Sequence, residues 1–363
     1  DEGRIAMPSA PGEGRRKIGE IAREANVPVK TLPALHELLS GDLNLAGRIR
    51  PVQVEDVLGR EQVDVDIGEV AAYVRDRAVL VTGAGGSIGS ELCRQLARLG
   101  VGRLILVEQG ETPLYDIERE RGDERDFTAV VPGRADCGDR PKMRQVLERY
   151  PPDIVFHAAA YKHVPMLEAN PLQAVANNVL ATRALAEIAV EFGVERFVLI
   201  STDKAANPQN LLGQSKAVCE WIVESFALRD DVDTRFVAVR FGNVLGSSGS
   251  VIPIFRRQIE RGGPVTVTHP EMTRFFMTIP EAVGLVLQSF VQGKGGEIFV
   301  LDMGQPVKIV DLAERMIRLS GLQPGYDIEI VFTGVRPGER LHEILFAEHE
   351  PFTETGISGI VAA

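Results

Sequence analysis

The sequence predicts an α/β protein: a Rossmann-like, doubly wound parallel sheet with a smaller C-terminal α/β region. From about residue 76, short buried-strand runs alternate with helical patterns, as in a parallel sheet that helices cover on both faces. A glycine-rich turn follows the first run and opens a helix. After about residue 245, glycine and proline become more frequent and the strand runs shorter, which indicates the smaller region.

The apolar runs of the main region are short and bounded by polar or turn residues, as buried parallel strands are. The predicted strands are Val79–Thr82, Arg103–Glu108, Thr128–Pro132, Asp153–Ala158, Arg196–Ser201 and Phe236–Arg240. Helical spacing between them predicts helices over Ile88–Leu99, around Met143–Leu147 and over Ala181–Phe192. The smaller region contributes strands at Val265–Thr268 and Ile298–Leu301.

Residues 1–63 are predicted to form a partial N-terminal α/β segment with a linker, because they are too few for a complete doubly wound domain. The pattern is a strand at 4–8, a helix at Arg16–Asn26, a strand at Val27–Leu32, a helix at Pro33–Ser40 and a linker over 41–70. The main domain is then residues 64–363, with a dinucleotide-binding core at about 76–245 and a substrate-binding region mainly at 246–350.

Bulk properties narrow the partners and the compartment. The formal net charge of -11 would repel nucleic-acid phosphates, so we expect no nucleic-acid partner. The three cysteines are far apart and fit a reducing, cytoplasmic setting. No apolar stretch approaches the roughly 18 residues that span a bilayer, so these residues are expected to make no membrane contact.

The turn after the first strand has the form of a dinucleotide cradle. Gly83, Gly86 and Gly89 are spaced G-x-x-G-x-x-G, and Ser87 and Ile88 begin the helix whose N–H groups would face a pyrophosphate. Glu108 ends the next strand, where a carboxylate accepts hydrogen bonds from a ribose 2′-hydroxyl and repels a 2′-phosphate. The sequence therefore predicts NAD rather than NADP, although Glu108 could also be a solvated strand end.

Two further positions are expected to line this cofactor. Asp136 follows the third strand, within reach of an adenine amino group. Ala158 and Ala159 end the fourth strand with side chains small enough for the backbone to approach the cofactor. Tight packing alone would also explain the alanines.

Thr202, Asp203 and Lys204 follow the fifth strand, so they would lie at the edge of the sheet where open α/β sheets bind ligands. An adjacent acid and base can serve two proton transfers, although a surface ion pair is the alternative. Lys216 has the lysine's place in a Tyr-x-x-x-Lys spacing that would bind the nicotinamide ribose, but leucine replaces tyrosine at 212. The proton relay would therefore run through Thr202 or Asp203.

No metal site is predicted. His157 and His163 have no apparent third ligand, and zinc sites need three or four.

Long stretches of the chain resemble the extended short-chain dehydrogenases/reductases, and more narrowly the CapD-like nucleotide-sugar 4,6-dehydratases of polysaccharide biosynthesis. The resemblance lies in LVTGAGGSIGSELCRQL (80–96), FHAAAYKHVPMLEANP (156–171), NNVLATRALAE (177–187), LISTDKAANPQNLLGQSK (199–216), VRFGNVLGSSGSVIPIF (239–255) and RPGERLHE (336–343). Residues 4–63 resemble the segment that precedes the catalytic domain in the long, membrane-anchored branch. A full-length protein would then be anchored in the inner membrane with this part on the cytoplasmic side.

The resemblance implies UDP-N-acetylglucosamine or a related UDP-sugar as the substrate and NAD-dependent elimination of water as the reaction. Oxidation at C4 of the sugar would acidify the C5 proton, which Lys204 would remove. Asp203 would protonate the departing C6 hydroxyl, hydride would return to C6, and Thr202 would help to deprotonate the C4 hydroxyl. The product would be a UDP-4-keto-6-deoxy sugar, and the protein would form homo-oligomers as other members do.

The same motifs imply six substrate-binding residues. Asn243 is expected at the sugar or diphosphate, and Glu339 at the uridine ribose. Arg274 and Arg336 are expected at the diphosphate, because guanidinium groups suit phosphate oxygens. Lys162 and His163 would lie in a loop near the sugar. Each arginine could instead form an ordinary surface ion pair.

Two other functions remain open. A UDP-sugar 4-epimerase on the same scaffold would need oxidation at C4 alone and no Asp203–Lys204 pair. A non-catalytic dinucleotide-binding homologue would also explain Leu212.

Overall fold

The computed structural model describes residues 67–125 and 129–363, together with 3–5, 21, 29–31, 50–51 and 63. The chain forms two compact units. The larger unit comprises Val63–Ser250, Glu271–Val307 and Gly334–Ala363. The smaller unit comprises Asp1–Gln62, Val251–Pro270 and Lys308–Thr333. The expected boundary near residue 63 and the substrate-binding role of residues 246–350 stay predictions.

Within the described residues, the larger unit is built on a nine-stranded sheet in the order β17-β18-β14-β9-β8-β7-β4-β5-β6. Its members are β4 (Ala78–Thr82), β5 (Arg103–Glu108), β6 (Val130–Arg134), β7 (Ile154–His157), β8 (Arg196–Ile200), β9 (Arg235–Arg240), β14 (Ile298–Leu301), β17 (Thr353–Glu354) and β18 (Ile360–Ala362). The strands from β6 to β14 are parallel, whereas β18 and β17 add an antiparallel edge. The predicted doubly wound parallel sheet is confirmed.

The predicted strands match these elements closely, with one shift. The strand expected at Thr128–Pro132 begins at Val130 and continues to Arg134, because it pairs with β5 from Leu104↔Val130 to Glu108↔Arg134. Residue 128 lies outside the described residues. Pro132 is tolerated because β6 is the edge strand, where the missing N–H group leaves no ladder bond unmade.

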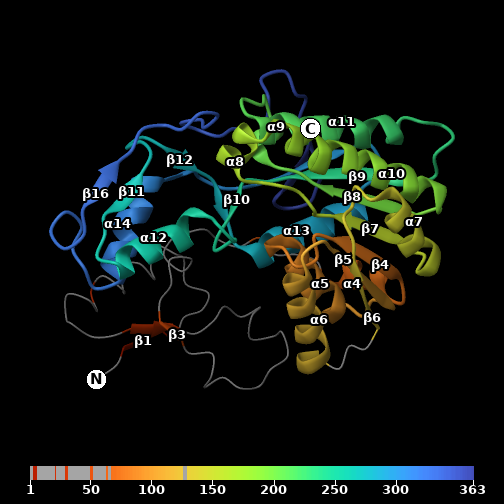
Figure 1. Cartoon of the computed structure of the whole chain (residues 1–363), viewed down its shortest axis with the longest axis horizontal. Helices are drawn as coiled ribbons and strands as arrows, with labels where there is room; N and C mark the ends of the chain where they lie inside the picture. Colours follow the sequence, from red (N-terminus) through yellow and green to blue (C-terminus); the bar gives the residue numbers. More distant parts are fainter. Residues whose placement is uncertain are drawn as a thin grey trace. The chain divides into compact units, whose positions relative to one another are not determined.

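Helices cover both faces of this sheet (Figure 1). One face packs against α4 (Ile67–Val74), α5 (Ser87–Arg98), α6 (Glu111–Arg125) and α13 (Ile279–Gln292). The other packs against α7 (Arg140–Arg149), α10 (Ala181–Glu191) and α11 (Leu211–Ala227). The alternation of strand side chains separates the two cores: along β4, Val79 and Val81 face the first and Leu80 the second.

Strand β4 lies between β5 and β7, so the direction in which strands are added reverses at β4. The loops after these carboxyl ends diverge there, which is where open α/β sheets bind ligands. The larger unit also contains several short elements: α8 (Val164–Ala169), α9 (Pro171–Gln173), a π-helical segment (Ala174–Leu180), β10 (Asn243–Val244), β12 (Thr273–Arg274) and β13 (Phe276–Met277). Strand β10 pairs with β13, and β12 pairs with β15 (Val307–Lys308).

The smaller unit contains α12 (Val251–Glu260), α14 (Ile309–Leu319) and a parallel pair of β11 (Val265–Val267) with β16 (Ile330–Phe332). Near the N-terminus, β1 (Gly3–Ile5) pairs in parallel with β2 (Val29–Thr31), and β3 (Arg50–Pro51) pairs antiparallel with β2. The helices expected at Arg16–Asn26 and Pro33–Ser40 lie outside the described residues, except for helical Ile21.

The linker expected at residues 41–70 is wrong in two places. Backbone pairing with β2 makes Arg50–Pro51 a strand, and α4 begins at Ile67 because Val70 and Val74 are buried in the core of the larger unit. Among the described residues, no helix is both long and apolar enough to cross a membrane.

Candidate active site

Strand β8 ends at Ile200 and delivers three polar residues to the carboxyl edge of the sheet. Thr202 caps a 3₁₀ turn (Asp203–Ala205): its Oγ1 accepts a hydrogen bond from the Lys204 backbone N–H at 3.4 Å and donates one to Asp203 Oδ1 at 2.9 Å. The Asp203 N–H donates to the Phe241 carbonyl at 2.9 Å, just beyond β9. The turn is therefore fixed to two neighbouring strands.

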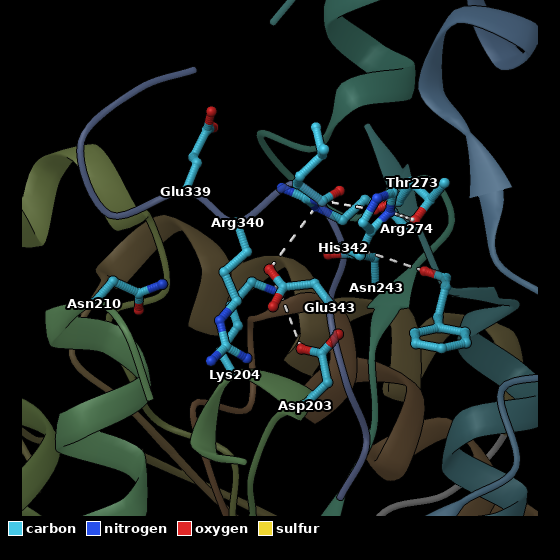
Figure 2. Close-up of polar contacts among 12 residues, drawn as sticks. Asp203, Lys204, Asn210, Asn243, Thr273, Arg274, Glu339, Arg340, His342 and Glu343 are labelled. Atoms are coloured by element: carbon cyan, nitrogen blue, oxygen red, sulfur yellow. Dashed lines mark hydrogen bonds and ion pairs between the residues drawn. The ribbon is translucent and has the colours of Figure 1, made fainter. Parts of the chain in front are cut away.

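Asp203 and Lys204 form a buried pair rather than a surface one (Figure 2). Lys204 Nζ donates to Asp203 Oδ1 at 2.9 Å, and the two side chains are 13% and 0% exposed. Burial alone would lower the pKa of Lys204, but the charges of Asp203 and of the nearby Glu343 outweigh it. The pKa of Lys204 therefore lies above its ordinary value, and Lys204 rests as an ammonium.

Glu343 is the residue of this site that sequence reasoning missed. Its carboxylate is 2% exposed, and its Oε1 lies 3.5 Å from Lys204 Nζ and 3.9 Å from Arg274 Nε. The four side chains form a buried cluster with two acids and two bases (Figure 2). The only signal in the sequence was its place in the stretch 336–343, because nothing local links residue 343 to residue 204.

Two oxygens of this cluster have no hydrogen-bond partner among the residues that the structure describes: Asp203 Oδ2 and Glu343 Oε2. Buried carboxylate oxygens are nearly always hydrogen-bonded, so such a pair in one cluster points to a polar ligand. Gly242 keeps the space beside Asp203 open, because a Cβ atom at Gly242 would lie 3.1 Å from Oδ2.

Helix α11 begins after Asn210, whose Oδ1 caps the Gly213 N–H at 2.8 Å. Leu212 in its first turn is buried against Leu167 and Ala174, so it is a packing residue. Lys216 lies one turn further and donates from Nζ to the Ile200 carbonyl at 2.8 Å. Burial lowers the pKa of Lys216, and this lysine reaches the strand end that carries Thr202.

The glycine-rich turn between β4 and α5 is shaped for backbone contact. Gly83 has φ +64°, and a Cβ on it would lie 2.9 Å from the Ala159 backbone. A Cβ on Gly89 would lie 2.0 Å from the Gly83 carbonyl oxygen, so no other residue fits there. Gly86 caps α5 without a side-chain hydrogen bond. The first N–H groups of α5 therefore suit an anion such as a pyrophosphate.

The remaining cofactor residues lie around this turn. Glu108 ends β5 and accepts from the Gly85 N–H at 3.2 Å and from the Gly110 N–H at 3.0 Å, which holds its carboxylate beside the cradle.

Asp136 is exposed after β6. Ala158 donates from its N–H to the Thr82 carbonyl at 3.2 Å, and Ala159 to Thr82 Oγ1 at 3.3 Å. Ser87 Oγ accepts from the Ser248 N–H at 3.2 Å, and Ile88 packs against the core.

Replacing Glu108 tests its expected role in cofactor choice. The unchanged chain should bind NAD more tightly than NADP, and Glu108→Gln should narrow that preference by about tenfold, because a charged hydrogen bond to the ribose is lost and a 2′-phosphate is no longer repelled. Isothermal titration with both dinucleotides measures the ratio. Asp136→Asn is the matched control, since it should weaken both equally; an unchanged ratio in the Glu108 variant would contradict the assignment.

The predicted substrate residues fall into two groups. Arg274 lies inside the cluster, where Nη1 donates to the Thr273 carbonyl at 2.7 Å and to the Leu341 carbonyl at 3.3 Å. Its guanidinium group thus faces Glu343, and its assignment to the diphosphate stays a prediction. Asn243 donates from Nδ2 to the Phe275 carbonyl at 3.2 Å.

The other four are more open. Arg336 and Glu339 share one turn, in which Glu339 Oε2 accepts from the Arg336 N–H at 3.2 Å. In Figure 2 the Glu339 carboxylate points away from the Asp203–Lys204 pair. Lys162 and His163 are exposed in the loop before α8, and the His163 ring lies so close to Gly249 that a Cβ there would be 2.5 Å from Cε1. Their contacts with a substrate also stay predictions.

His157 is a structural residue. It is fully buried at the end of β7, with ring nitrogens 2.7 Å from Thr82 Oγ1 and 2.9 Å from Thr182 Oγ1. Burial lowers the pKa of His157 to about 3, so the ring is neutral. The described residues contain no group of three or more side chains that could hold a metal ion.

Comparison with known proteins places this chain in a family. The family model "Polysaccharide biosynthesis protein" matches residues 79–363. The capsular polysaccharide biosynthesis protein CapD of Staphylococcus aureus is 48% identical over 95% of this chain, but the chain spans only 57% of that relative's length. A solved dTDP-glucose 4,6-dehydratase from Streptomyces venezuelae, with NAD bound, shares the fold at a TM-score of 0.64 and 20% identity, covering 74% of this chain and 87% of its own.

Two enzymes with different activities are about equally similar to this chain. A UDP-glucose 4-epimerase of Rickettsia conorii is 33% identical over 76% of this chain and 79% of its own length. A UDP-N-acetylglucosamine 4,6-dehydratase (inverting) of Campylobacter jejuni is 34% identical over 75% of this chain and 78% of its own length. The family model matches most of the length of this chain. The chain therefore belongs to the CapD-like polysaccharide biosynthesis proteins, which are related to NAD-dependent nucleotide-sugar dehydratases and epimerases.

Proposed function

We propose that this chain is a UDP-N-acetylglucosamine 4,6-dehydratase that eliminates water across C5 and C6 of the sugar. The observation that carries the proposal is the buried Asp203–Lys204 pair, joined at 2.9 Å at the end of β8. An elimination needs a base at C5 and an acid at the C6 oxygen, whereas epimerisation at C4 needs no acid or base at those two positions. The Gly83–Gly89 cradle fits NAD, and bound NAD supplies the reversible oxidation at C4 on which the elimination depends.

Thr202 and Asp203 suit the release of the C4 hydroxyl proton. Thr202 Oγ1 already donates to Asp203 Oδ1 at 2.9 Å, so a proton taken by Thr202 from the sugar can be passed to the carboxylate. This path replaces the missing phenol, because Leu212 has no proton to exchange. Asp203 then holds the proton that it later donates to the departing C6 oxygen, which leaves as water.

Lys204 suits the removal of the C5 proton. A ketone at C4 makes this proton acidic, and the Lys204 amine, once neutral, takes it as general base. The same ammonium can return a proton to C5 after C6 has been reduced. The C4 hydroxyl proton thereby leaves in the water, and the C5 position is protonated again.

Mass spectrometry tests the proposal against the 4-epimerase, which the Rickettsia relative keeps as the alternative. Incubation of the chain with UDP-N-acetylglucosamine and NAD should give a UDP-sugar lighter by one water. A product of unchanged mass but altered C4 configuration would instead establish epimerisation. Binding of NAD without turnover of any UDP-sugar would favour the non-catalytic homologue.

A further inference from the structure

The proposed reaction leaves one proton without a destination. Lys204 rests as an ammonium, and it must lose that proton before it can take another from C5. Asp203 cannot receive it, because Asp203 holds the proton from the C4 hydroxyl until water leaves. The Lys204 side chain is 13% exposed, so release to bulk solvent is restricted. A second acceptor inside the site would complete the sequence.

Glu343 has the position and the chemistry of that acceptor. Its Oε1 lies 3.5 Å from Lys204 Nζ. Its Oε2 is buried without a hydrogen-bond partner among the described residues, so neutralising the carboxylate disrupts no bond at that oxygen. Resting on the proposed function, we propose that Glu343 is a positioning residue that takes the ammonium proton of Lys204 and returns it at the end of each turnover.

The other charged groups around Lys204 do not offer this route. Asp203, on the same turn, is the acid of the elimination. Arg274 on β12 and Arg340 in the C-terminal segment are cations and so cannot accept a proton. Arg340 donates to the carbonyls of Ala206 and Asn207. Lys216 on α11 donates to the Ile200 carbonyl. Arg274 lies 3.9 Å from Glu343 Oε1. The proton returns to Lys204 once the cycle ends, because an amine binds a proton more tightly than a carboxylate does.

The proton transfers balance. Before reaction, Asp203 and Glu343 are carboxylates and Lys204 is an ammonium. The C4 hydroxyl proton passes to Asp203, and the Lys204 proton passes to Glu343. Neutral Lys204 takes the C5 proton, and Asp203 gives its proton to the C6 oxygen. Lys204 then protonates C5 and recovers its own proton from Glu343, which restores the starting state.

Glu343→Gln tests this inference because it keeps the shape of the side chain and removes the proton acceptor. Single turnovers of the full chain with NAD and UDP-N-acetylglucosamine should show C4 oxidation, read as absorbance at about 340 nm, within a few-fold of the unchanged chain. Water loss at neutral pH should fall by at least about tenfold. The remaining rate should rise about tenfold per pH unit, since solvent must now take the Lys204 proton.

Two variants control this experiment. Glu343→Asp retains a carboxylate and should restore part of the rate with little pH dependence. Glu348→Gln makes the same change at an exposed position on the same segment and should behave as the unchanged chain. Two results would overturn the inference while the proposed function stands. One is that Glu343→Gln loses water at the original rate. The other is that C4 oxidation falls as much as water loss does and the pH profile is unchanged. An unchanged chain that releases no water overturns both.

Discussion

Replacing Lys204 by alanine is expected to reduce water loss by at least about a hundredfold, the usual range for removing a general base. The reason is that Lys204 is the one base of the Asp203–Lys204 pair, and its Nζ is joined to the acid that acts on the next carbon. Binding of NAD should be unaffected, because the Gly83–Gly89 cradle is formed by another loop. Mass spectrometry of the UDP-sugar over time measures the loss.

Two variants make this result specific. Lys204→Arg keeps a positive charge beside Asp203 but cannot give up its proton at neutral pH, so it should be as inactive as Lys204→Ala. Lys294→Ala, at an exposed lysine, should keep full activity. Full water loss by either Lys204 variant would reject the assignment of the base.

Replacing Arg240 by methionine is expected to destabilise the protein by about 3–5 kcal/mol, because the buried Glu220 and the partly buried Glu350 lose their partner. Arg240 on β9 is 1% exposed, and its guanidinium group donates to Glu220 and Glu350, each at 2.8 Å, and to the Leu345 carbonyl at 3.1 Å. This network ties α11 and β9 to the C-terminal segment that carries Glu343. Urea unfolding at neutral pH measures the change.

A surface pair is the matched control for this prediction. Arg183 is 65% exposed and pairs with Glu187 on the same helix, so Arg183→Met should leave the unfolding midpoint almost unchanged. Equal effects of the two substitutions would show that the Arg240 network does not stabilise the fold.

The network also gives stability a pH dependence. Burial alone would raise the pKa of Glu350, but its hydrogen bonds to Arg240 and the Ala347 N–H lower it below the ordinary value. A depressed carboxyl pKa contributes stability above its unfolded value of about 4.3 and loses it as the pH falls towards the folded value.

The sheet could be predicted because each strand is a short apolar run with its own turn signals. Arg103–Glu108 has the predicted bounds, and its pairing with the two neighbouring strands runs from Arg103 to Glu108. The third strand could not be placed to the residue: its end depends on pairing between Glu108 and Arg134, and its polar final residues carry no strand pattern.

The acid–base pair could be located from the sequence because its members are adjacent on a strand end. Glu343 could not, because its place beside Lys204 depends on how the C-terminal segment returns to the sheet. The Arg240–Glu350 ion pair is one of the contacts that hold this segment in place, and it joins residues 110 positions apart. Leu212 is equally instructive: its spacing suggested a missing catalytic group, whereas in three dimensions it packs against Leu167.

The position of deuterium in the product tests the central claim most directly. In deuterated water, the unchanged chain should convert UDP-N-acetylglucosamine into a 4-keto-6-deoxy sugar that carries deuterium at C5, detected by proton NMR and mass, because the base that removes the C5 proton exchanges with solvent between turnovers. A dehydrated product that retains its original C5 hydrogen, or a UDP-sugar that keeps its C6 oxygen, would contradict an elimination driven by Asp203 and Lys204.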